Sequence, residues 1–295
     1  MKDKSKVLKT VKRLVVVLLL IVFAGSAVKL GLIYKDYKKM EKVYDEAAAE
    51  FTKPSAAAGE AAKAQLSAPQ DEQASDAADA PDEPSAPPEY APIEVDFDKL
   101  LEVNSDVIGW IYCEDTVLNY PLLYGRDNQF YLYKDYRGEY GTGGAIFSDM
   151  KNTGNFHDSN VIFYGHHMQN QTIFAPLKHW LKQEFYDEHP IMWILTPEQD
   201  YKVELFSGHV VWAGSDTYTV FNEPTPEFEE YLLDMKNDSE FSADVELDPN
   251  AHYVMLSTCA YSFQDARTVL HGKLVPVDSA GGKPPPTEGE TAPQK

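Results

Sequence analysis

Cysteine is the scarcest reactive residue in this chain, with two copies among 295 residues, at positions 113 and 259. Basic residues are also few, since 26 Lys and Arg stand against 47 Asp and Glu and give a formal net charge of −21. Such a chain lacks the clustered positive charge that binds a nucleic-acid backbone, so we expect no nucleic acid among its partners. No internal repeats are apparent. Hydrophobic and aromatic contents of 43% and 12% are ordinary for a globular protein, so a core can form.

A long apolar run occurs only near the N-terminus. Residues 1–13 are rich in Lys and Arg, and residues 14–34 are apolar apart from Lys29. As a helix, the second segment would extend about 32 Å, which matches a bilayer core of about 30 Å. The positive-inside rule then places residues 1–13 in the cytoplasm and the rest of the chain outside, as in a single-pass type II membrane protein. The alternative is a signal peptide cleaved near residues 24–27.

Large apolar residues are almost missing from residues 54–92, which are rich in Ala, Pro, Ser, Asp and Glu. Such a stretch cannot bury enough surface to offset its chain entropy, so we expect it to be disordered. The segment before it, up to residue 51, has a helix-forming composition and is interpreted as a stalk that extends the membrane anchor. Together, residues 35–92 form the predicted stalk and linker. Residues 279–295 are predicted to be a disordered tail.

The remaining residues, 93–278, are predicted to fold as one mainly β domain. Short runs rich in Val, Ile, Tyr, Phe and Trp, bounded by Gly, Asn, Asp and Pro, predict strands. These runs are 107–113, 117–124, 144–149, 160–166, 191–196, 202–213, 253–258 and 266–277. Eight short strands in one domain favour a closed barrel or a sandwich.

Three segments of this domain have helical patterns instead. An opening helix is predicted over residues 95–106, and two helical insertions over residues 172–182 and 225–238. In the last of these, Thr225 suits the N-cap position and Pro226 the first helical position.

Reactive side chains stand at the ends of several predicted strands. His166 and His167 follow a strand and a glycine, Cys259 closes a strand, and Arg267 opens the next one. A thiolate is a nucleophile, a nearby cation lowers the pKa of a thiol, and an imidazole can move a proton. An arginine can donate hydrogen bonds to an oxyanion or hold a substrate. The simpler interpretation, a buried cysteine with surface histidines and a surface arginine, remains open on spacing alone.

The chain also resembles a known family. The stretches VIGWIYCEDTVLNYPLLYGRDNQFYL, GGAIFSDMKN, VIFYGHHMQNQTIFAPLKHW and LSTCAYSFQDARTVLHGKLV are similar to sortases, the membrane-anchored cysteine transpeptidases of Gram-positive bacteria, and most of all to class B. The resemblance runs from about residue 95 to 277. It implies a closed eight-stranded sortase-type β barrel with an N-terminal helix and helical insertions, of which the segment 225–238 is one.

The resemblance also implies roles for individual residues. The nucleophile falls on Cys259, the general acid/base on His166 and the arginine on Arg267, whereas His167 is interpreted as a supporting residue. Contacts to the substrate are expected from four further residues: Ser257, Thr258, Asn128 and Leu132. The chemistry implied needs neither a metal nor an organic cofactor.

The activity implied is cleavage of a C-terminal sorting motif on secreted proteins through a thioacyl intermediate on Cys259. The acyl group then passes to an amine of a cell-wall precursor or of a pilin lysine. One alternative is a cysteine peptidase that releases the acyl group to water. Another is an anchored metal-binding module that uses His157, His166 and His167. Because a disulfide between Cys113 and Cys259 would silence the enzyme, two free thiols are expected.

Overall fold

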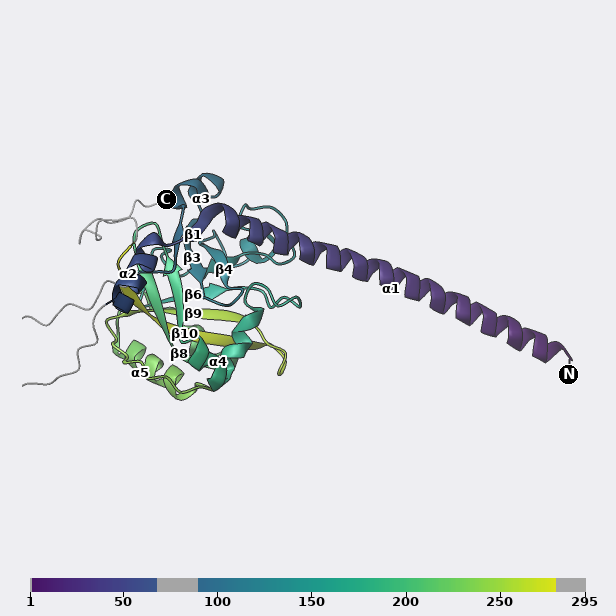
Figure 1. Cartoon of the computed structure of the whole chain (residues 1–295). Coiled ribbons are helices and arrows are strands. Elements are labelled where there is room, and N and C mark those ends of the chain that lie inside the picture. Colours follow the sequence, from purple (N-terminus) through teal and green to yellow (C-terminus); the bar gives the residue numbers. More distant parts are fainter. Residues whose placement is uncertain (1, 68–89, 280–295) are drawn as a thin grey trace, which may run out of the picture.

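The computed structural model describes residues 2–67 and 90–279. Eight strands close into a barrel in the order β10-β8-β7-β3-β4-β5-β6-β9, which confirms the predicted fold class. The strands are β3 (Val107–Tyr112), β4 (Asn119–Leu123), β5 (Ile146–Ser148), β6 (Asn160–Tyr164), β7 (Ile191–Leu195), β8 (Asp200–Trp212), β9 (His252–Cys259) and β10 (Ala266–Val277). Two neighbouring pairs, β4–β5 and β6–β9, are parallel, and the other six pairs are antiparallel. Figure 1 shows the barrel at one end of the molecule.

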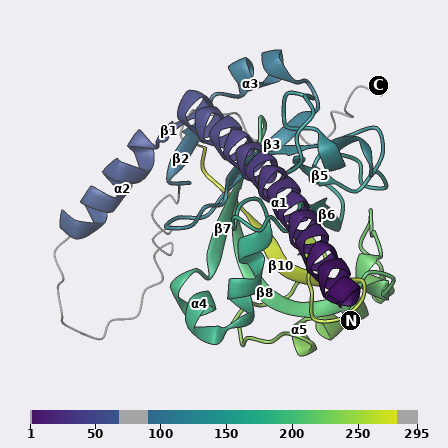
Figure 2. The same ribbon diagram turned by 90° about the vertical axis from the view of Figure 1, so that its right-hand side faces the viewer.

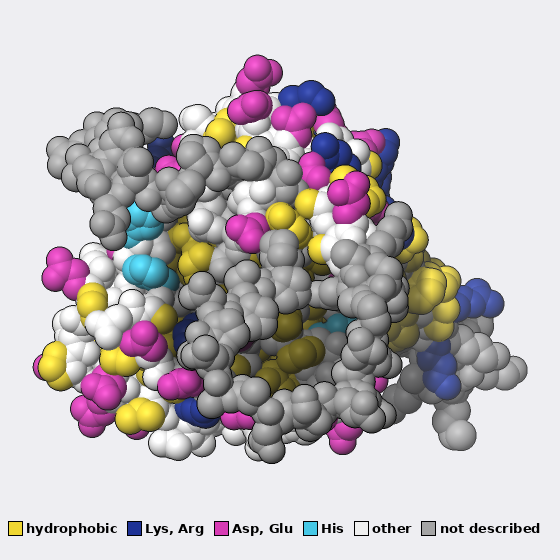
Figure 3. All heavy atoms as spheres, turned by 60° about the vertical axis from the view of Figure 1, so that its left-hand side comes forward, with side chains coloured by type: hydrophobic (Ala, Val, Ile, Leu, Met, Phe, Trp, Pro, Cys, Tyr) yellow, Lys and Arg dark blue, Asp and Glu magenta, His cyan; other side chains and the backbone are white. Residues whose placement is uncertain are grey.

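The interior of the barrel is filled by large apolar side chains that alternate along the strands with outward-facing ones. Among the largest fully buried side chains, the strand residues Trp110, Phe147 and Phe163 lie in the main core, whereas Phe206 and Tyr253 belong to a second cluster. Outside, acidic side chains are spread over the face drawn in Figure 3, as the net charge requires. The apolar core therefore makes the barrel a rigid scaffold for the loops at its ends.

Helices cover the barrel close to where the sequence predicts them. The opening helix α3 (Phe97–Val103) is shorter than expected because Asp96 caps it, its side chain accepting from the Lys99 amide at 3.2 Å. Helix α5 (Pro226–Asn237) begins as predicted, with Thr225 accepting from the Phe228 amide. One more short element, the 3-10 turn η3 (Asp216–Tyr218), lies between β8 and α5.

The segment predicted to be helical over residues 172–182 contains a different element. It forms the 3-10 helix η2 (Ala175–Leu181), followed by the α-helix α4 (Gln183–Glu188). Lys182 adopts an extended conformation between the two and ends the first helix. A further 3-10 turn, η1 (Phe130–Tyr133), precedes the loop that leads to β5.

The N-terminal helix α1 (Lys2–Phe51) runs without a break from the apolar segment to the barrel. The side chains of residues 14–23 project into solvent, and within the described residues α1 is the one helix long and apolar enough to cross a membrane. Its last turns bury a stripe with helical spacing against the barrel. The stripe consists of Met40, Val43, Tyr44, Ala47 and Phe51. Figure 1 shows the N-terminal part of α1 projecting away from the barrel, with only its C-terminal end against it, and Figure 2 shows the same helix pointing toward the viewer.

This packing corrects the expected boundary between linker and domain. After α1, strand β1 (Thr52–Pro54) pairs with β2 (Ile93–Val95), and helix α2 (Ala56–Ser67) follows. The folded body therefore starts within α1 rather than at residue 93, and residues 54–67 are not the disordered chain that their composition predicts. Because α1 reaches the barrel directly, the predicted spacer does not separate the anchor from the domain. The rest of the predicted linker, 68–89, and of the tail, 280–295, lies outside the described residues.

Candidate active site

The pairing of β6 with β9 brings two of the predicted residues to one end of the barrel. The strands are parallel, with Tyr164 opposite Ser257, and the ladder continues through the Gly165 amide, which donates to the Ser257 carbonyl at 3.1 Å. His166 and Cys259 each come two residues after the aligned pair. Because parallel strands run in the same direction, both residues emerge at the same rim of the barrel.

The pairing of β9 with β10 adds the arginine. Arg267 lies directly opposite Cys259 in this antiparallel ladder, a relation in which side chains are neighbours on one face of the sheet. The guanidinium is partly buried and donates to the Ala266 carbonyl at 2.9 Å. Within residues 2–67 and 90–279, no carboxylate forms an ion pair with it. Its remaining N–H groups are thus available to an oxygen of a bound molecule.

The two adjacent histidines make different hydrogen bonds. The Nε2 atom of His166 lies 2.6 Å from the Leu132 carbonyl, and Nδ1 of His167 lies 2.8 Å from the Cys259 carbonyl. Since a carbonyl can only accept, each of these nitrogens carries the hydrogen. Nδ1 of His166 has no hydrogen bond to the described residues, so it is the ring nitrogen that can take up a proton. His167 instead holds the backbone of Cys259.

The environment of His167 supports a structural role for this ring. Partial burial lowers its pKa, and the hydrogen bond to the Cys259 carbonyl acts in the opposite direction. The exposed ring of Tyr261 lies edge-on to the imidazole, with 5.2 Å between the centroids. A neutral ring between an aromatic side chain and a carbonyl suits support of the site better than proton transfer.

A chain of hydroxyl groups lies beside the end of β9 that carries Cys259. The Tyr218 hydroxyl is 2.8 Å from Oγ of Ser257, and the Tyr218 ring stacks on Tyr164. The Tyr164 hydroxyl donates to the Asp149 carboxylate at 2.7 Å. Burial raises the pKa of Tyr218, while its hydrogen bond to Ser257 lowers it. The hydrogen bond between Tyr218 and Ser257 ties the segment before α5 to β9, and Tyr164 ties β6 to Asp149.

The four predicted substrate contacts have varied surroundings. Ser257 and Thr258 are each 2% exposed, so they offer little side-chain surface, although the Thr258 hydroxyl has no partner among the described residues. Asn128 donates to the same Asp149 carboxylate at 2.9 Å and so joins the chain of hydroxyl groups. Leu132 is half-buried, and its carbonyl is the acceptor for His166. Contacts of these four with a substrate stay predictions.

The two cysteines are free and differ in environment. Cys113 is 1% exposed, and burial raises the pKa of its thiol to about 11. Cys259 is partly exposed at the end of β9. The expectation of two free thiols is confirmed, and Cys113 behaves as a buried core residue.

The histidines proposed for the alternative metal site do not share a site. His157 contacts His252, with 6.5 Å between the ring centroids, whereas His166 and His167 make the hydrogen bonds described above. Among the side chains that the structure describes, no three His, Cys, Asp or Glu are close enough to hold one ion. This placement gives the metal-binding interpretation no support.

Sequence reasoning missed three residues of this hydrogen-bonded chain near Cys259: Asp149, Tyr164 and Tyr218. The position of Tyr164, one residue before the Gly–His pair, is a signal that could have been used. Tyr218 lies in an irregular segment between β8 and α5, where no periodicity points to a site. Its importance follows only from the tertiary contact with Ser257.

Comparisons with known proteins agree with this geometry. The chain is 35% identical to sortase B of Listeria monocytogenes over 180 residues, which cover 60% of this chain and 72% of the relative. It is 33% identical to sortase B of Staphylococcus aureus over 183 residues, or 61% of this chain and 75% of the relative. No family model matches the chain.

Solved structures of the same kind superpose on the barrel. Clostridium perfringens sortase B matches with a TM-score of 0.58 at 31% identity, covering 61% of this chain and 99% of that one. A Staphylococcus aureus sortase B–substrate complex also matches with a TM-score of 0.58, at 33% identity, covering 62% of this chain and 85% of that one. With such identity over most of the relatives' length, the chain belongs to the sortase B family and is a sortase, a cysteine transpeptidase.

Proposed function

We propose that Cys259, His166 and Arg267 are the nucleophile, the general acid/base and the oxyanion donor of this transpeptidase. The observation that carries the proposal is the strand register. β6, β9 and β10 are neighbours in the barrel, and their pairing aligns the three residues at one rim. A nucleophile, a proton carrier and a cationic donor at one rim are the parts that acyl transfer requires.

In the first step, the Cys259 thiolate attacks the threonine carbonyl of a C-terminal sorting motif. A tetrahedral intermediate forms, and its oxyanion accepts hydrogen bonds from the free N–H groups of Arg267. The C–N bond then breaks as Nδ1 of His166 delivers a proton to the leaving amine. The downstream segment departs and a thioester remains on Cys259, so charge and protons balance.

In the second step, an amine attacks the thioester and passes its proton to His166. The new amide leaves the site, and the thiolate of Cys259 and the imidazolium of His166 are restored. A structure of a sortase B complexed with triglycine, 33% identical to this chain, supports an amine acceptor of this kind. We propose a cell-wall precursor or a pilin lysine as the source of the amine.

The N-terminal helix supports an enzyme that works at the outer face of the membrane. The exposed apolar half of α1 follows a basic segment, so we propose a type II anchor with residues 93–278 outside the cell. A protease added to intact protoplasts should remove the barrel and leave the segment inside the membrane protected. A protected barrel would refute this orientation.

The proposed reaction is tested with a library of sorting peptides and candidate amines. The purified full chain is incubated with both, and the products are identified by mass spectrometry. Ligated products whose yield rises with the amine concentration support transpeptidation. Cleaved peptide alone at every amine concentration would instead identify a cysteine peptidase. Cys259→Ala serves as the control and should give neither product.

A further inference from the structure

We propose that Tyr44, in the barrel-docked end of α1, is a positioning residue that sets the orientation of the His166 ring. The inference deepens the proposed function, since it rests on His166 as the general acid/base. It assigns the membrane-proximal helix a role in catalysis beyond attachment. Three contacts connect the helix to the imidazole.

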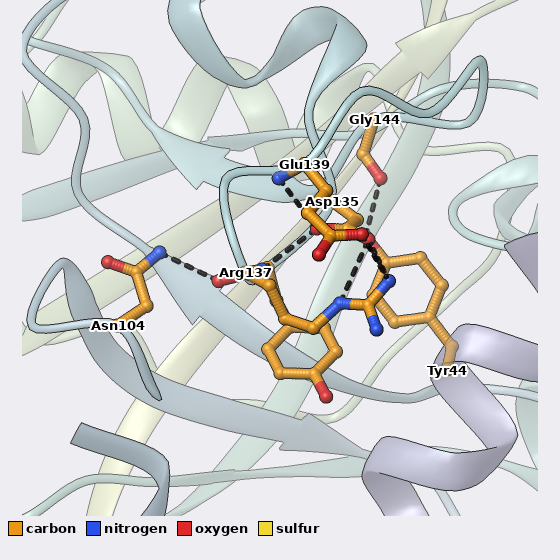
Figure 4. Close-up of polar contacts among 7 residues, drawn as sticks. Tyr44, Asn104, Asp135, Arg137, Glu139 and Gly144 are labelled. Atoms are coloured by element: carbon orange, nitrogen blue, oxygen red, sulfur yellow. Dashed lines mark hydrogen bonds and ion pairs between the residues drawn. The ribbon is translucent and has the colours of Figure 1, made fainter. Parts of the chain in front are cut away.

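The first contact joins α1 to the loop after η1. The Tyr44 hydroxyl donates to the Gly144 carbonyl at 2.5 Å, and the tyrosine is 5% exposed (Figure 4). Burial raises the pKa of this hydroxyl strongly, so it remains a donor at any physiological pH. The ring also packs edge-on against Tyr120 of β4, with 5.2 Å between the centroids. Tyr44 is thus held by the barrel and holds the loop in turn.

The second contact lies within the loop. Gly144 has a φ of +58°, and its Cα is so near the Leu132 backbone that an added Cβ would lie 2.5 Å from the Leu132 carbonyl oxygen. The next residue, Ala145, donates its amide hydrogen to the Tyr131 carbonyl at 3.0 Å. A shift of Gly144 therefore moves the Leu132 carbonyl, because the two backbones touch.

The third contact reaches the catalytic ring. The same Leu132 carbonyl accepts the hydrogen bond from Nε2 of His166 at 2.6 Å. It fixes the tautomer that leaves Nδ1 for proton transfer. The neighbouring Tyr133 ring lies 5.8 Å from the imidazole, centroid to centroid. Two loop residues therefore position the His166 ring: Leu132 through a hydrogen bond and Tyr133 through a ring contact.

The remainder of the loop is stiff enough to transmit a displacement. The buried Asp135 carboxylate accepts from the backbone amides of Arg137 and Glu139 and forms an ion pair with the Arg137 guanidinium at 2.6 Å. Asn104 donates to the Tyr136 carbonyl at 2.7 Å. Figure 4 shows these groups gathered beside Tyr44. A loop fixed at so many points moves as one body rather than absorbing a shift locally.

Met40 provides an independent contact between α1 and the same loop. A side chain at Gly141 would collide with the Met40 thioether, and one at Gly143 would meet both Met40 and Met168 at 3.5 and 3.6 Å. Met168 comes two residues after His166. Met40 of the helix and Met168 of the histidine segment therefore both lie against Gly143 of the loop.

The test compares Tyr44→Phe with Tyr253→Phe in the full chain, in detergent. Tyr253 is a matched control, because it is also buried and its hydroxyl hydrogen-bonds to the backbone of Asp248. It stands at the other end of β9, six residues before Cys259, or about 20 Å at about 3.3 Å per residue. Thermal melts, kcat and KM with a cleavable sorting peptide, and 15N spectra of the imidazole rings are measured for each.

We expect Tyr44→Phe to lower kcat about 10-fold with little change in KM, since small displacements of a catalytic group are costly. The His166 ring signals, assigned by their loss in His166→Ala, should change from one tautomer to a mixture. Tyr253→Phe should lower the melting temperature without changing kcat or the tautomer of His166. Met40→Ala should shift the tautomer of His166 in the same direction but less. If Tyr44→Phe fails to fold, Met40→Ala is the variant that tests whether the docked end of α1 sets the His166 ring.

An unchanged His166 tautomer in folded Tyr44→Phe, or in Met40→Ala when the first variant does not fold, would overturn the inference. An equal loss of kcat in Tyr253→Phe would do so as well. An active His166→Ala would refute the proposed function instead, whatever Tyr44 does. The two failures are thus distinguishable.

Discussion

Strands β8, β9 and β10 carry titratable side chains in two places with opposite properties. At the rim, Cys259 and Arg267 are partly exposed and face each other. Toward the middle, His271 of β10 stacks on His209 of β8 at 5.6 Å, and both rings are buried beneath α5. Burial lowers the pKa of both histidines, and for His271 the neighbouring His209 adds to the effect.

The contrast teaches that position along a strand, rather than residue type, decides which groups are available for chemistry. The buried pair is held from above by α5, whose Tyr231 hydroxyl lies 3.2 Å from Nε2 of His271. Its groups are sealed from any substrate, so substituting them should change stability rather than turnover. The rim groups are open and contribute little to the core. Mutations at the two places should therefore change different measured quantities.

The largest effect is expected from the two cysteines, which show the same contrast. Cys259→Ala should reduce turnover by at least about 10³-fold, as loss of a nucleophile does, and leave the free energy of unfolding within about 1 kcal/mol. Cys113→Ala should retain turnover and lose about 1 kcal/mol or more of stability, because it opens a cavity in the core. Peptide cleavage and denaturant unfolding of both variants check this. The reverse pattern would exclude Cys259 as the nucleophile.

Arg267→Lys should have the next largest effect. A lysine keeps the charge but cannot reproduce the planar fork of donors. We expect kcat/KM to fall by about 10²–10³-fold, or about 2.7–4 kcal/mol, as for other oxyanion donors. The melting temperature should hardly change. Steady-state kinetics with the sorting peptide measure the loss, and wild-type kcat/KM in this variant would show that Arg267 makes no transition-state contact.

The buried histidines should make the protein sensitive to acid. They are neutral in the folded state, whereas in the unfolded chain they take up protons below about pH 6.5, so the unfolded state binds more protons there. Stability should therefore fall as the pH drops below about 6.5, by up to about 1.4 kcal/mol per pH unit for each histidine.

The variant His271→Phe should reduce this slope of the free energy of unfolding by the contribution of one histidine. His157→Gln, at an exposed site, should leave the slope unchanged. Urea unfolding between pH 5.5 and 7.5 gives the slopes. Equal slopes in wild type and His271→Phe would mean that the buried pair is not the acid-sensitive element.

The smallest effect is expected from His167→Ala. It removes one hydrogen bond to the Cys259 carbonyl, worth about 1 kcal/mol, so turnover should fall by about 5-fold. His166→Ala should cost far more, because it removes the proposed proton carrier. Steady-state kinetics of the two variants, measured side by side, check this. A greater loss of turnover in His167→Ala would mean that His167, rather than His166, is the general acid/base.

Much of the barrel was predictable because its strands carry a local signal. β-branched and aromatic runs predicted all eight strands, and β10 has the predicted bounds. The cap at Thr225 was equally local. The three reactive residues were predicted from their places at strand ends and from the family resemblance. Their alignment required the register of β6, β9 and β10, which no single strand specifies.

What the sequence did not reveal depends on tertiary contacts. Met40 to Phe51 do have helical spacing, but they lie among Lys and Glu residues that suit a solvated stalk equally well. The pairing of β1 with β2 closes across a long intervening segment, and composition alone predicted disorder there. Tyr218 and the buried histidines acquire their roles only when distant elements pack together.

The unbroken course of α1 has a consequence for where the enzyme can act. The apolar segment ends at residue 34, and Tyr37 already packs against the folded body, a rise of about 4.5 Å along the helix axis. With the proposed anchor in place, this short rise holds the barrel close to the lipid. Substrates must come to the enzyme at the membrane surface, so we expect it to act on polypeptides as they emerge from the bilayer rather than on proteins already deep in the wall.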